Sequence, residues 1–385
     1  MEIGESSMAI MKPGKLIRLS KSCLGHNEKS AVMGVLDREF LGMGAEVQQF
    51  EQALSDFFGR PVLCVTNGTA ALQLALEAAG IGPGDEVLVQ SLTYVASFQA
   101  IAATGARPVA CDVDPLTLTL NLDDAEKRLT SRTKAVMPVH YSGGVGALDK
   151  IYTFAESHGL RVIEDAAHAF GSMHQGKRVG GFGDIACFSF DGIKNITSGE
   201  GGCIVTSDQS VLHHVRDARL LGVERDTEKR FAGERSWEFD VTSQGWRYHM
   251  SNIMAAIGLE QLKRISQMSS TRKLLARRYD TLLTNHDRIK TLPHDYEFVV
   301  PHIYVVSIQG LVDRKVLQSQ LLEYGIQSGI HYQPNHVLSY FRESSTLPMP
   351  MTEAIFPGLL SLPLHADLSE SDVDFVCQQL QKILK

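Results

Sequence analysis

Phe188-Ser-Phe-Asp-Gly-Ile-Lys-Asn-Ile-Thr-Ser-Gly-Glu-Gly-Gly202 interrupts an otherwise regular alternation of strands and helices. It joins two β-rich runs, residues 185–190 and 203–207, through a glycine-containing loop with no helix between them. Lys194 lies in this loop. An amine held beside a ligand can form a Schiff base with a carbonyl group. Because most lysines are solvated surface residues, an ordinary loop lysine is the competing interpretation.

Elsewhere in residues 60–250, short β-branched runs alternate with helical segments such as 70–79 and 147–158, which end at glycines. This alternation predicts βαβ units and a mainly parallel sheet covered on both faces. The predicted strands are residues 62–66, 86–90, 107–111, 134–139, 161–164, 185–190 and 203–207.

From residue 251 the pattern changes to a long helix, at residues 252–272 and beyond, then to mixed elements and a last helix at 369–385. We therefore predict a flexible tail at residues 1–15, a large α/β domain at 16–250 and a smaller α+β domain at 251–385. A length of 385 residues agrees with two domains.

The composition is that of an ordinary globular protein, with 44% hydrophobic and 21% charged residues. A formal net charge of -7 argues against a broad nucleic-acid surface. The six cysteines form no CxxC pair, which favours buried free thiols over disulfides or a zinc site. No apolar run is long enough to span a membrane, and no signal peptide is evident, so we expect a cytoplasmic protein.

Two turns that follow predicted strands carry polar groups. Ligands of open α/β sheets bind outside the carboxyl ends of the strands. Thr66-Asn-Gly-Thr69 opens a helix there, so its N–H groups and Gly68 can admit a phosphate, although a plain helix cap is equally consistent. Asp165 follows another strand, where a carboxylate can keep a heteroaromatic nitrogen protonated or can cap a helix. His168, taken alone, is typical of a structural histidine.

Two further residues complete a candidate site. Ser189 ends the strand before the Lys194 loop, and Tyr94 follows a third strand, where its ring can cover a planar ligand or pack in the core. A phosphate cradle, a carboxylate for a ring nitrogen, an aromatic lid and a Schiff-base lysine are together what pyridoxal 5′-phosphate (PLP) requires of a protein.

These residues resemble a known family, the DegT/DnrJ/EryC1/StrS sugar aminotransferases. The resemblance runs from about residue 16 to the C-terminus in the family's order. It is carried by Asn67-Gly-Thr-Ala-Ala-Leu72, Glu164-Asp-Ala-Ala-His-Ala-Phe-Gly171, Lys194-Asn-Ile-Thr-Ser-Gly-Glu-Gly-Gly202, Met250-Ser-Asn-Ile-Met-Ala-Ala-Ile-Gly-Leu259, Gly329-Ile-His-Tyr-Gln-Pro-Asn-His336 and Leu360-Ser-Leu-Pro-Leu-His365.

The resemblance implies the aspartate-aminotransferase fold (type I), PLP as cofactor, and a homodimer with active sites at the dimer interface. By the same resemblance, Lys194 is the Schiff-base lysine, Asp165 partners the pyridine nitrogen and Tyr94 stacks on the ring. His168 stands near the ring hydroxyl, where the family more often has glutamine. Phosphate-binding positions are matched by Gly68, Thr69 and Ser189.

The chain departs from the family at Gly245-Trp-Arg-Tyr-His-Met250, where the family often reads Gly-x-Asn-Tyr-Arg-Met. Arg247 replaces the asparagine usually donated to the neighbouring subunit's phosphate. Its ligand stays open between the cofactor phosphate, the donor carboxylate and a nucleotide diphosphate. In the C-terminal run, His331, Tyr332 and His336 are candidate substrate-binding residues at the sugar-nucleotide entrance, with structural turn histidines as an equal alternative.

The implied reaction moves an amino group from L-glutamate to a nucleotide-linked keto-deoxysugar for a surface glycan such as an O-antigen. We favour C4 amination of a dTDP-4-keto-6-deoxyhexose, with C3 amination as the alternative. Lys194 favours transamination, because relatives with histidine at this position dehydrate sugars instead. A nicotinamide enzyme is disfavoured, since Gly181-Phe-Gly-Asp-Ile-Ala186 precedes its strand, whereas a dinucleotide fingerprint follows one. A non-catalytic PLP or sugar-nucleotide binder is the more distant alternative.

Overall fold

A computed structural model describes residues 16–235, 237–345 and 347–385, and the predicted tail at 1–15 lies outside them. Its centre is a seven-stranded sheet in the order β1-β9-β8-β5-β4-β2-β3, which contains all the strands predicted above. These strands are β1 (Val62–Val65), β2 (Glu86–Gln90), β3 (Arg107–Cys111), β4 (Thr133–Met137), β5 (Arg161–Asp165), β8 (Ile185–Ser189) and β9 (Gly202–Thr206).

The sheet is mainly parallel, as predicted. β3, β2, β4, β5 and β8 run in one direction, and only β9 is reversed, pairing antiparallel with both β8 and β1. The reversal arises at the Lys194 loop, because two strands joined without a crossover helix pair antiparallel. The loop therefore opens at the carboxyl end of β8, beside the ends of its parallel neighbours.

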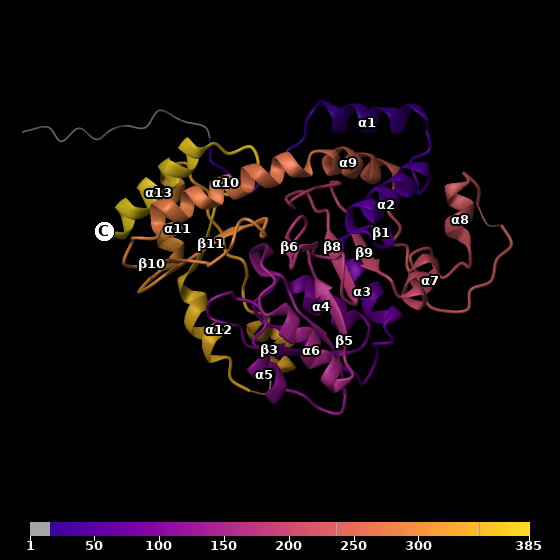
Figure 1. Cartoon of the computed structure of the whole chain (residues 1–385), viewed down its shortest axis with the longest axis horizontal. Coiled ribbons are helices and arrows are strands. Elements are labelled where there is room, and N and C mark those ends of the chain that lie inside the picture. The colour runs from indigo at the N-terminus through magenta and orange to yellow at the C-terminus, as the bar shows by residue number, and fades with distance from the viewer. Residues whose placement is uncertain (1–15, 236, 346) are drawn as a thin grey trace, which may run out of the picture.

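Both faces of the sheet are buried, since successive strand residues point to opposite sides. In β1, Leu63 and Val65 pack into a core with α3, α4 and α7, while Val62 and Cys64 pack against α2 and α9. Towards the other edge, α5 and α6 cover the second face (Figure 1). These helices are α2 (Ala45–Phe58), α3 (Gly68–Ala78), α4 (Val95–Ala103), α5 (Leu122–Lys127), α6 (Leu148–His158), α7 (Gln209–Ala218) and α9 (Asn252–Lys263).

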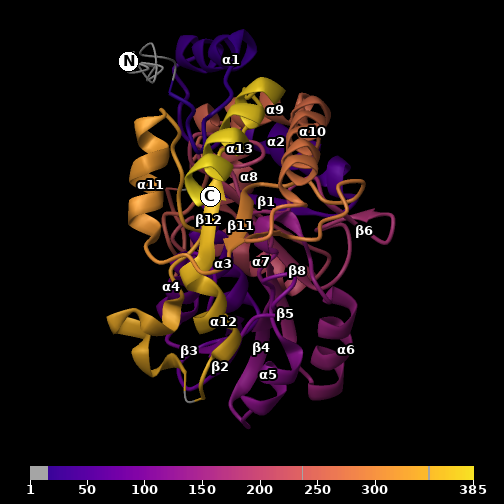
Figure 2. The same ribbon diagram turned by 90° about the vertical axis from the view of Figure 1, so that its left-hand side faces the viewer.

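The C-terminal part of the chain forms a second layer with its own core. Its three-stranded antiparallel sheet has the order β10-β11-β12 and packs against α10, α11 and α13 (Figure 2). Ile17 belongs to this core and bridges Ile326, so the described N-terminal end reaches the C-terminal layer. The elements are β10 (Ile289–Thr291), β11 (Tyr304–Ile308), β12 (Leu359–Leu362), α10 (Ile265–Leu283), α11 (Arg314–Glu323), α12 (Pro350–Ile355) and α13 (Glu370–Leu384).

Shorter elements complete the fold. Helix α1 lies over α9 at the edge of the molecule, and β6 and β7 form a hairpin (Figure 1). All six cysteines are free thiols, and all but Cys23 are buried, as expected from their spacing. The elements are α1 (His26–Asp37), α8 (Asp226–Phe231), β6 (Met173–His174), β7 (Lys177–Arg178) and four 3₁₀ turns at Tyr141–Gly143, Asn335–Val337, Ser339–Ser344 and Phe356–Gly358.

The prediction of one long helix from residue 252 is wrong in one respect, because the segment forms two helices, α9 and α10, that meet at Arg264. Arg264 leaves the helical conformation with φ −103° and ψ 3°. Its guanidinium forms an ion pair with Glu28 of α1 at 2.7 Å and donates to the carbonyl of Cys23 at 2.7 Å. Both partners lie more than 200 residues away in sequence, so the periodicity of the helix gave no sign of the break.

Candidate active site

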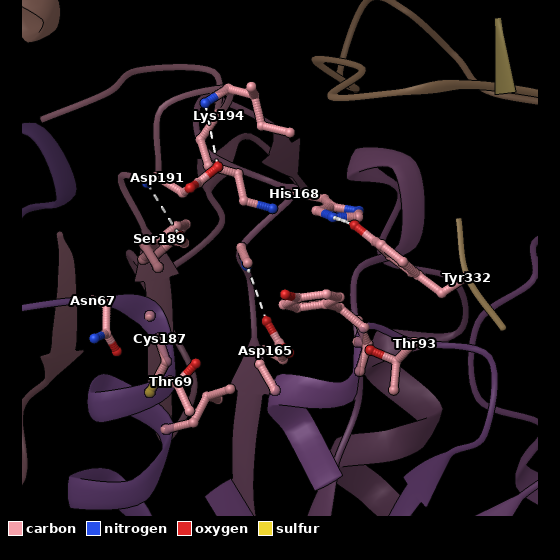
Figure 3. Close-up of a pocket in the computed structure, with 18 of the residues that line it drawn as sticks. Asn67, Thr69, Thr93, Asp165, His168, Cys187, Ser189, Asp191, Lys194 and Tyr332 are labelled. Carbon is pink, nitrogen blue, oxygen red and sulfur yellow. Dashed lines mark hydrogen bonds between the residues drawn. The ribbon is translucent and has the colours of Figure 1, made fainter. Parts of the chain in front are cut away.

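A pocket of about 540 Å³ opens at the carboxyl ends of the strands, where the sequence placed its candidate residues. Figure 3 shows Asp165, His168, Ser189, Lys194 and Tyr332 around this hollow, contributed by β5, β8 and three loops. The pocket is lined by Asn67, Gly68, Thr69, Leu72, Thr93, Tyr94, Ala96, Val139, Asp165, Ala167, His168, Cys187, Phe188, Ser189, Asp191, Ile193, Lys194, Glu200, His331 and Tyr332.

The first wall is the N-terminus of α3. Asn67 caps this helix by accepting the N–H of Ala70 at 2.8 Å, so the helix-cap interpretation holds. The turn also faces Ser189 so closely that a Cβ added at Gly68 would lie 2.8 Å from the Cβ of Ser189. A helix N-terminus with close backbone access is a favourable place for an anion, because its first N–H groups have no partner within the helix.

Asp165 forms the floor of the pocket at the end of β5. Its carboxylate accepts the hydroxyl of Ser97 at 2.7 Å and the N–H of Ala167 at 3.2 Å. The residue is 6% exposed, so these two donors fix the carboxylate in a largely dry setting. Such a carboxylate can hold a proton on a ring nitrogen placed beside it.

Lys194 projects into the pocket from the loop between β8 and β9 (Figure 3). Its backbone N–H donates to the carbonyl of Asp191 at 3.0 Å, which tightens the loop. Burial lowers the pKa of Lys194 from 10.5 to about 8, against the opposing effects of Asp165 and Asp191. About a tenth of the amine is therefore neutral at pH 7, far more than for an ordinary lysine, and the neutral amine is the nucleophilic form.

The opposite wall is aromatic. His168 Nε2 lies 2.9 Å from the hydroxyl of Tyr332, and the Tyr332 ring centroid is 5.3 Å from that of Tyr94. Burial, then Lys194 and His331, hold the pKa of His168 well below its ordinary value, so its ring is neutral. Tyr94 is 57% exposed at the start of α4, as suits a lid more than a core residue.

The C-terminal candidates divide into two groups. His331 and Tyr332 line the pocket, and His331 Nδ1 is 2.7 Å from the hydroxyl of Ser361. His336 is not among the lining residues, because its Nδ1 engages the hydroxyl of Ser91 at 2.7 Å and its Nε2 lies 3.6 Å from Glu353. Arg247 is also outside the pocket and is exposed on the surface, where its backbone bridges Leu220.

Two residues that touch the site were missed by sequence reasoning. Ser97 orients Asp165, and His302 Nε2 lies 3.4 Å from Lys194 Nζ. Ser97 lies three residues after Tyr94 and could have been considered. His302 is 108 residues from Lys194 and follows no predicted strand, so no spacing rule indicated it.

The model of the DegT/DnrJ/EryC1/StrS aminotransferase family matches residues 22–381. The chain belongs to this family. A curated relative, the spore coat polysaccharide biosynthesis protein SpsC of Bacillus subtilis (strain 168), is 34% identical over 385 residues, covering 98% of this chain and 99% of SpsC. The suspected resemblance is thereby confirmed.

Solved structures of aminotransferases are similar to this chain in both sequence and fold. The aminotransferase TlmJ of Streptoalloteichus hindustanus is 33% identical with a TM-score of 0.88, covering 96% of this chain and 99% of TlmJ. The PLP form of Spr1654 from Streptococcus pneumoniae is 29% identical with a TM-score of 0.87, covering 96% of this chain and 98% of Spr1654. The aspartate-aminotransferase-like fold is confirmed, and the chain is a PLP-dependent sugar aminotransferase.

The pocket fits this cofactor on its own geometry. Its volume of about 540 Å³ accommodates a small-molecule ligand. The space kept open by the absence of a Cβ at Gly68 lies at a helix N-terminus, as a phosphate requires. The buried Asp165 and the amine of Lys194 line the same pocket, where they can meet the two reactive ends of a pyridine aldehyde. Among the described residues, no group of three or more His, Cys, Asp or Glu side chains is placed to hold a metal ion.

Proposed function

We propose that this aminotransferase moves an amino group from L-glutamate to C4 of a dTDP-linked 4-keto-6-deoxyhexose, for a surface polysaccharide. The observation that carries the proposal is the meeting of Lys194, Asp165 and the Gly68 turn in one pocket. The destination is supported by SpsC, whose name assigns it to spore coat polysaccharide biosynthesis. The choice of nucleotide, of C4 and of glutamate rests on the family resemblance.

Bound PLP supplies an electron-withdrawing ring that stabilises negative charge at the carbon losing a proton. The chain's own residues do the rest. Lys194, with a pKa of about 8, takes a proton from the α-carbon of the amino donor as a neutral amine and returns it as an ammonium. Asp165, held by Ser97 and Ala167, keeps the ring nitrogen protonated so that the ring can accept charge.

His168 and Tyr332 form the wall that orients the ligands. The neutral His168 ring and the Tyr332 hydroxyl are hydrogen-bonded to each other, so either can offer a hydrogen bond to a hydroxyl group in the pocket. Gly68, Thr69 and Ser189 receive the phosphate in the proposal, and Tyr94 covers the ring. His331 and Tyr332 face the keto-sugar.

The exposed Arg247 supports a homodimer with shared active sites. A guanidinium is a strong partner for phosphate, yet Arg247 does not reach the pocket of its own chain. We assign it to the pocket of a second copy of the chain. His336, which also lies outside the pocket, has no assigned ligand in this scheme.

The test is a panel of nucleotide-linked 3-keto and 4-keto sugars incubated with PLP and L-glutamate, with products identified by mass spectrometry and NMR. We expect a 4-amino-4,6-dideoxy sugar and 2-oxoglutarate in equal amounts, and no product from Lys194→Ala. Conversion of 3-keto sugars alone would assign C3 amination. PLP binding without conversion of any sugar would favour a regulatory binder.

Borohydride reduction of the PLP-loaded protein, followed by peptide mapping, examines Lys194 independently of the sugar. Reduction fixes a Schiff base as a stable secondary amine, so the pyridoxyl group is expected on the peptide that contains Lys194. A label on a different lysine would remove Lys194 from its proposed role even if the sugar assignment held.

A further inference from the structure

His302 is a buried residue that contacts the Lys194 amine and is not among the residues that line the pocket. It lies just before β11 and is 3% exposed. Its Nε2 is 3.4 Å from Lys194 Nζ, within the range of a long hydrogen bond. The contact joins the C-terminal layer to the loop between β8 and β9.

The backbone of His302 is held from two sides. Its N–H donates to the carbonyl of Ser142 at 3.3 Å. Its carbonyl accepts Nη1 of Arg272, a residue of α10, at 3.0 Å, and the same Nη1 lies 3.3 Å from the carbonyl of Leu364. The backbone of His302 is therefore anchored independently of Lys194.

The electrostatic setting keeps the His302 ring neutral. Burial, followed by the charges of Lys194, His168, Arg272 and His331, holds the pKa of His302 well below its ordinary value. A neutral imidazole carries one proton and one acceptor nitrogen. Nδ1 of His302 is buried and has no hydrogen-bond partner among the described residues. With the proton on Nδ1, the acceptor nitrogen is Nε2, which faces the amine.

We propose that His302 is a positioning residue, whose Nε2 accepts one N–H of Lys194 and so holds the amine turned into the pocket. An acceptor on the N–H side leaves the lone pair of the neutral amine free to face a carbonyl carbon or an acidic proton. His302 does not take the proton itself, because its ring stays neutral. The inference rests on the proposed role of Lys194.

A neutral acceptor beside an amine also favours the ammonium form. The other groups that act on Lys194 are Asp165 and Asp191, which raise its pKa, and Arg272, which lowers it together with burial. If His302 is replaced by leucine, which offers no acceptor and admits little water, the Lys194 pKa should fall below about 8. A long hydrogen bond to a charged group predicts a shift of about one pH unit.

The experiment measures the pKa of Lys194 in the PLP-free protein. Trace acetylation by acetic anhydride at different pH values, with mass spectrometry of the peptide that contains Lys194, reports the neutral fraction of that amine. We compare the wild type with His302→Leu, His302→Gln and the matched control His294→Leu. His294 is a half-buried histidine whose pKa is lowered by desolvation to about 4, and it lies outside this pocket.

We expect the midpoint of His302→Leu to fall by about one pH unit, since the ammonium loses its acceptor. His302→Gln should restore most of the shift, because its amide oxygen can accept the same N–H, and His294→Leu should leave the midpoint unchanged. If His302→Leu does not fold, as judged by circular dichroism, His302→Phe keeps a flat ring without an acceptor and carries the same expectation. Equal midpoints in wild type and the acceptor-free variant, or equal shifts in the leucine and glutamine variants, would overturn the proposal.

Two separate measurements test the role of His302 and the role of Lys194. Borohydride labelling at Lys194 together with an unchanged midpoint in His302→Leu would leave the role of Lys194 intact and remove His302 from it. Labelling at another lysine would refute the role of Lys194, on which the inference depends.

Discussion

The substitution Gly68→Ala tests the proposed phosphate site formed by Gly68, Thr69 and Ser189. The added Cβ would lie 2.8 Å from the Cβ of Ser189 and 3.2 Å from its Oγ, and 3.4 Å from its backbone Cα. Favourable carbon–carbon contacts occur at about 3.5–4.0 Å, so α3 and the end of β8 must separate by about 1 Å. Overpacking of this kind costs about 1–3 kcal/mol of stability. The same movement widens the proposed phosphate site, and we expect the dissociation constant for PLP to rise at least about tenfold.

Urea unfolding of the PLP-free protein measures the stability, and equilibrium dialysis measures PLP affinity. Gly42→Ala is the matched control, because a Cβ there meets nothing within 4 Å. The double variant Gly68→Ala/Ser189→Gly removes the clashing Cβ, so it should regain most of the stability without regaining full PLP affinity. Wild-type stability and wild-type PLP affinity in Gly68→Ala would refute the steric argument.

Three further perturbations follow from the site and the fold. Because burial lowers the Lys194 pKa from 10.5 to about 8, the unfolded chain binds the extra proton between these values. Lys194→Met should therefore be more stable than wild type below pH 8, as measured by urea unfolding. This difference in stability should disappear as the pH rises to 10.5. A difference that does not change with pH would contradict the argument. Ser97→Ala removes a 2.7 Å hydrogen bond from the buried Asp165 carboxylate, and it should lower kcat/KM about tenfold and cost about 1–3 kcal/mol of stability; unchanged turnover would show that Asp165 needs no such support. Arg264→Ala leaves the buried Glu28 without its ion pair and should cost about 2 kcal/mol in thermal or urea unfolding, whereas a loss within error would mean that the helix break does not depend on this contact.

The strands and the polar groups at their ends were predictable because both depend on local patterns. Asp165 and Ser189 end β5 and β8, and Gly68 follows β1 by three residues, so the topology of the sheet brings them to one edge. Lys194 could be placed in the same way, since the missing helix in its connection forces an antiparallel return. The assignment of PLP then needed only the chemistry of these side chains and the resemblance to a family.

The contacts made by the second layer were not predictable in this way. The break at Arg264 depends on Glu28, and the environment of Lys194 depends on His302. His336 depends on such contacts too, because its motif groups it with His331 and Tyr332, while Ser91 and Glu353 hold it outside the pocket. A side chain's partners are set by how the layers pack, and no periodicity within one segment carries that information.

Local sequence patterns were enough to place the strands along the chain, to locate the missing helix at the Lys194 loop and to indicate the kind of chemistry that its residues can perform. Hydrophobic periodicity and turn residues act over a few positions, so they can be read locally. The protonation state of Lys194, the lysine proposed to carry out the reaction, depends instead on the tertiary structure. The pKa of Lys194 is lowered to about 8 by burial, and His302, whose Nε2 lies 3.4 Å from the amine, comes from the other layer of the molecule. Desolvation and hydrogen bonding depend on atoms within a few ångströms in space, and the folded chain alone brings those atoms together.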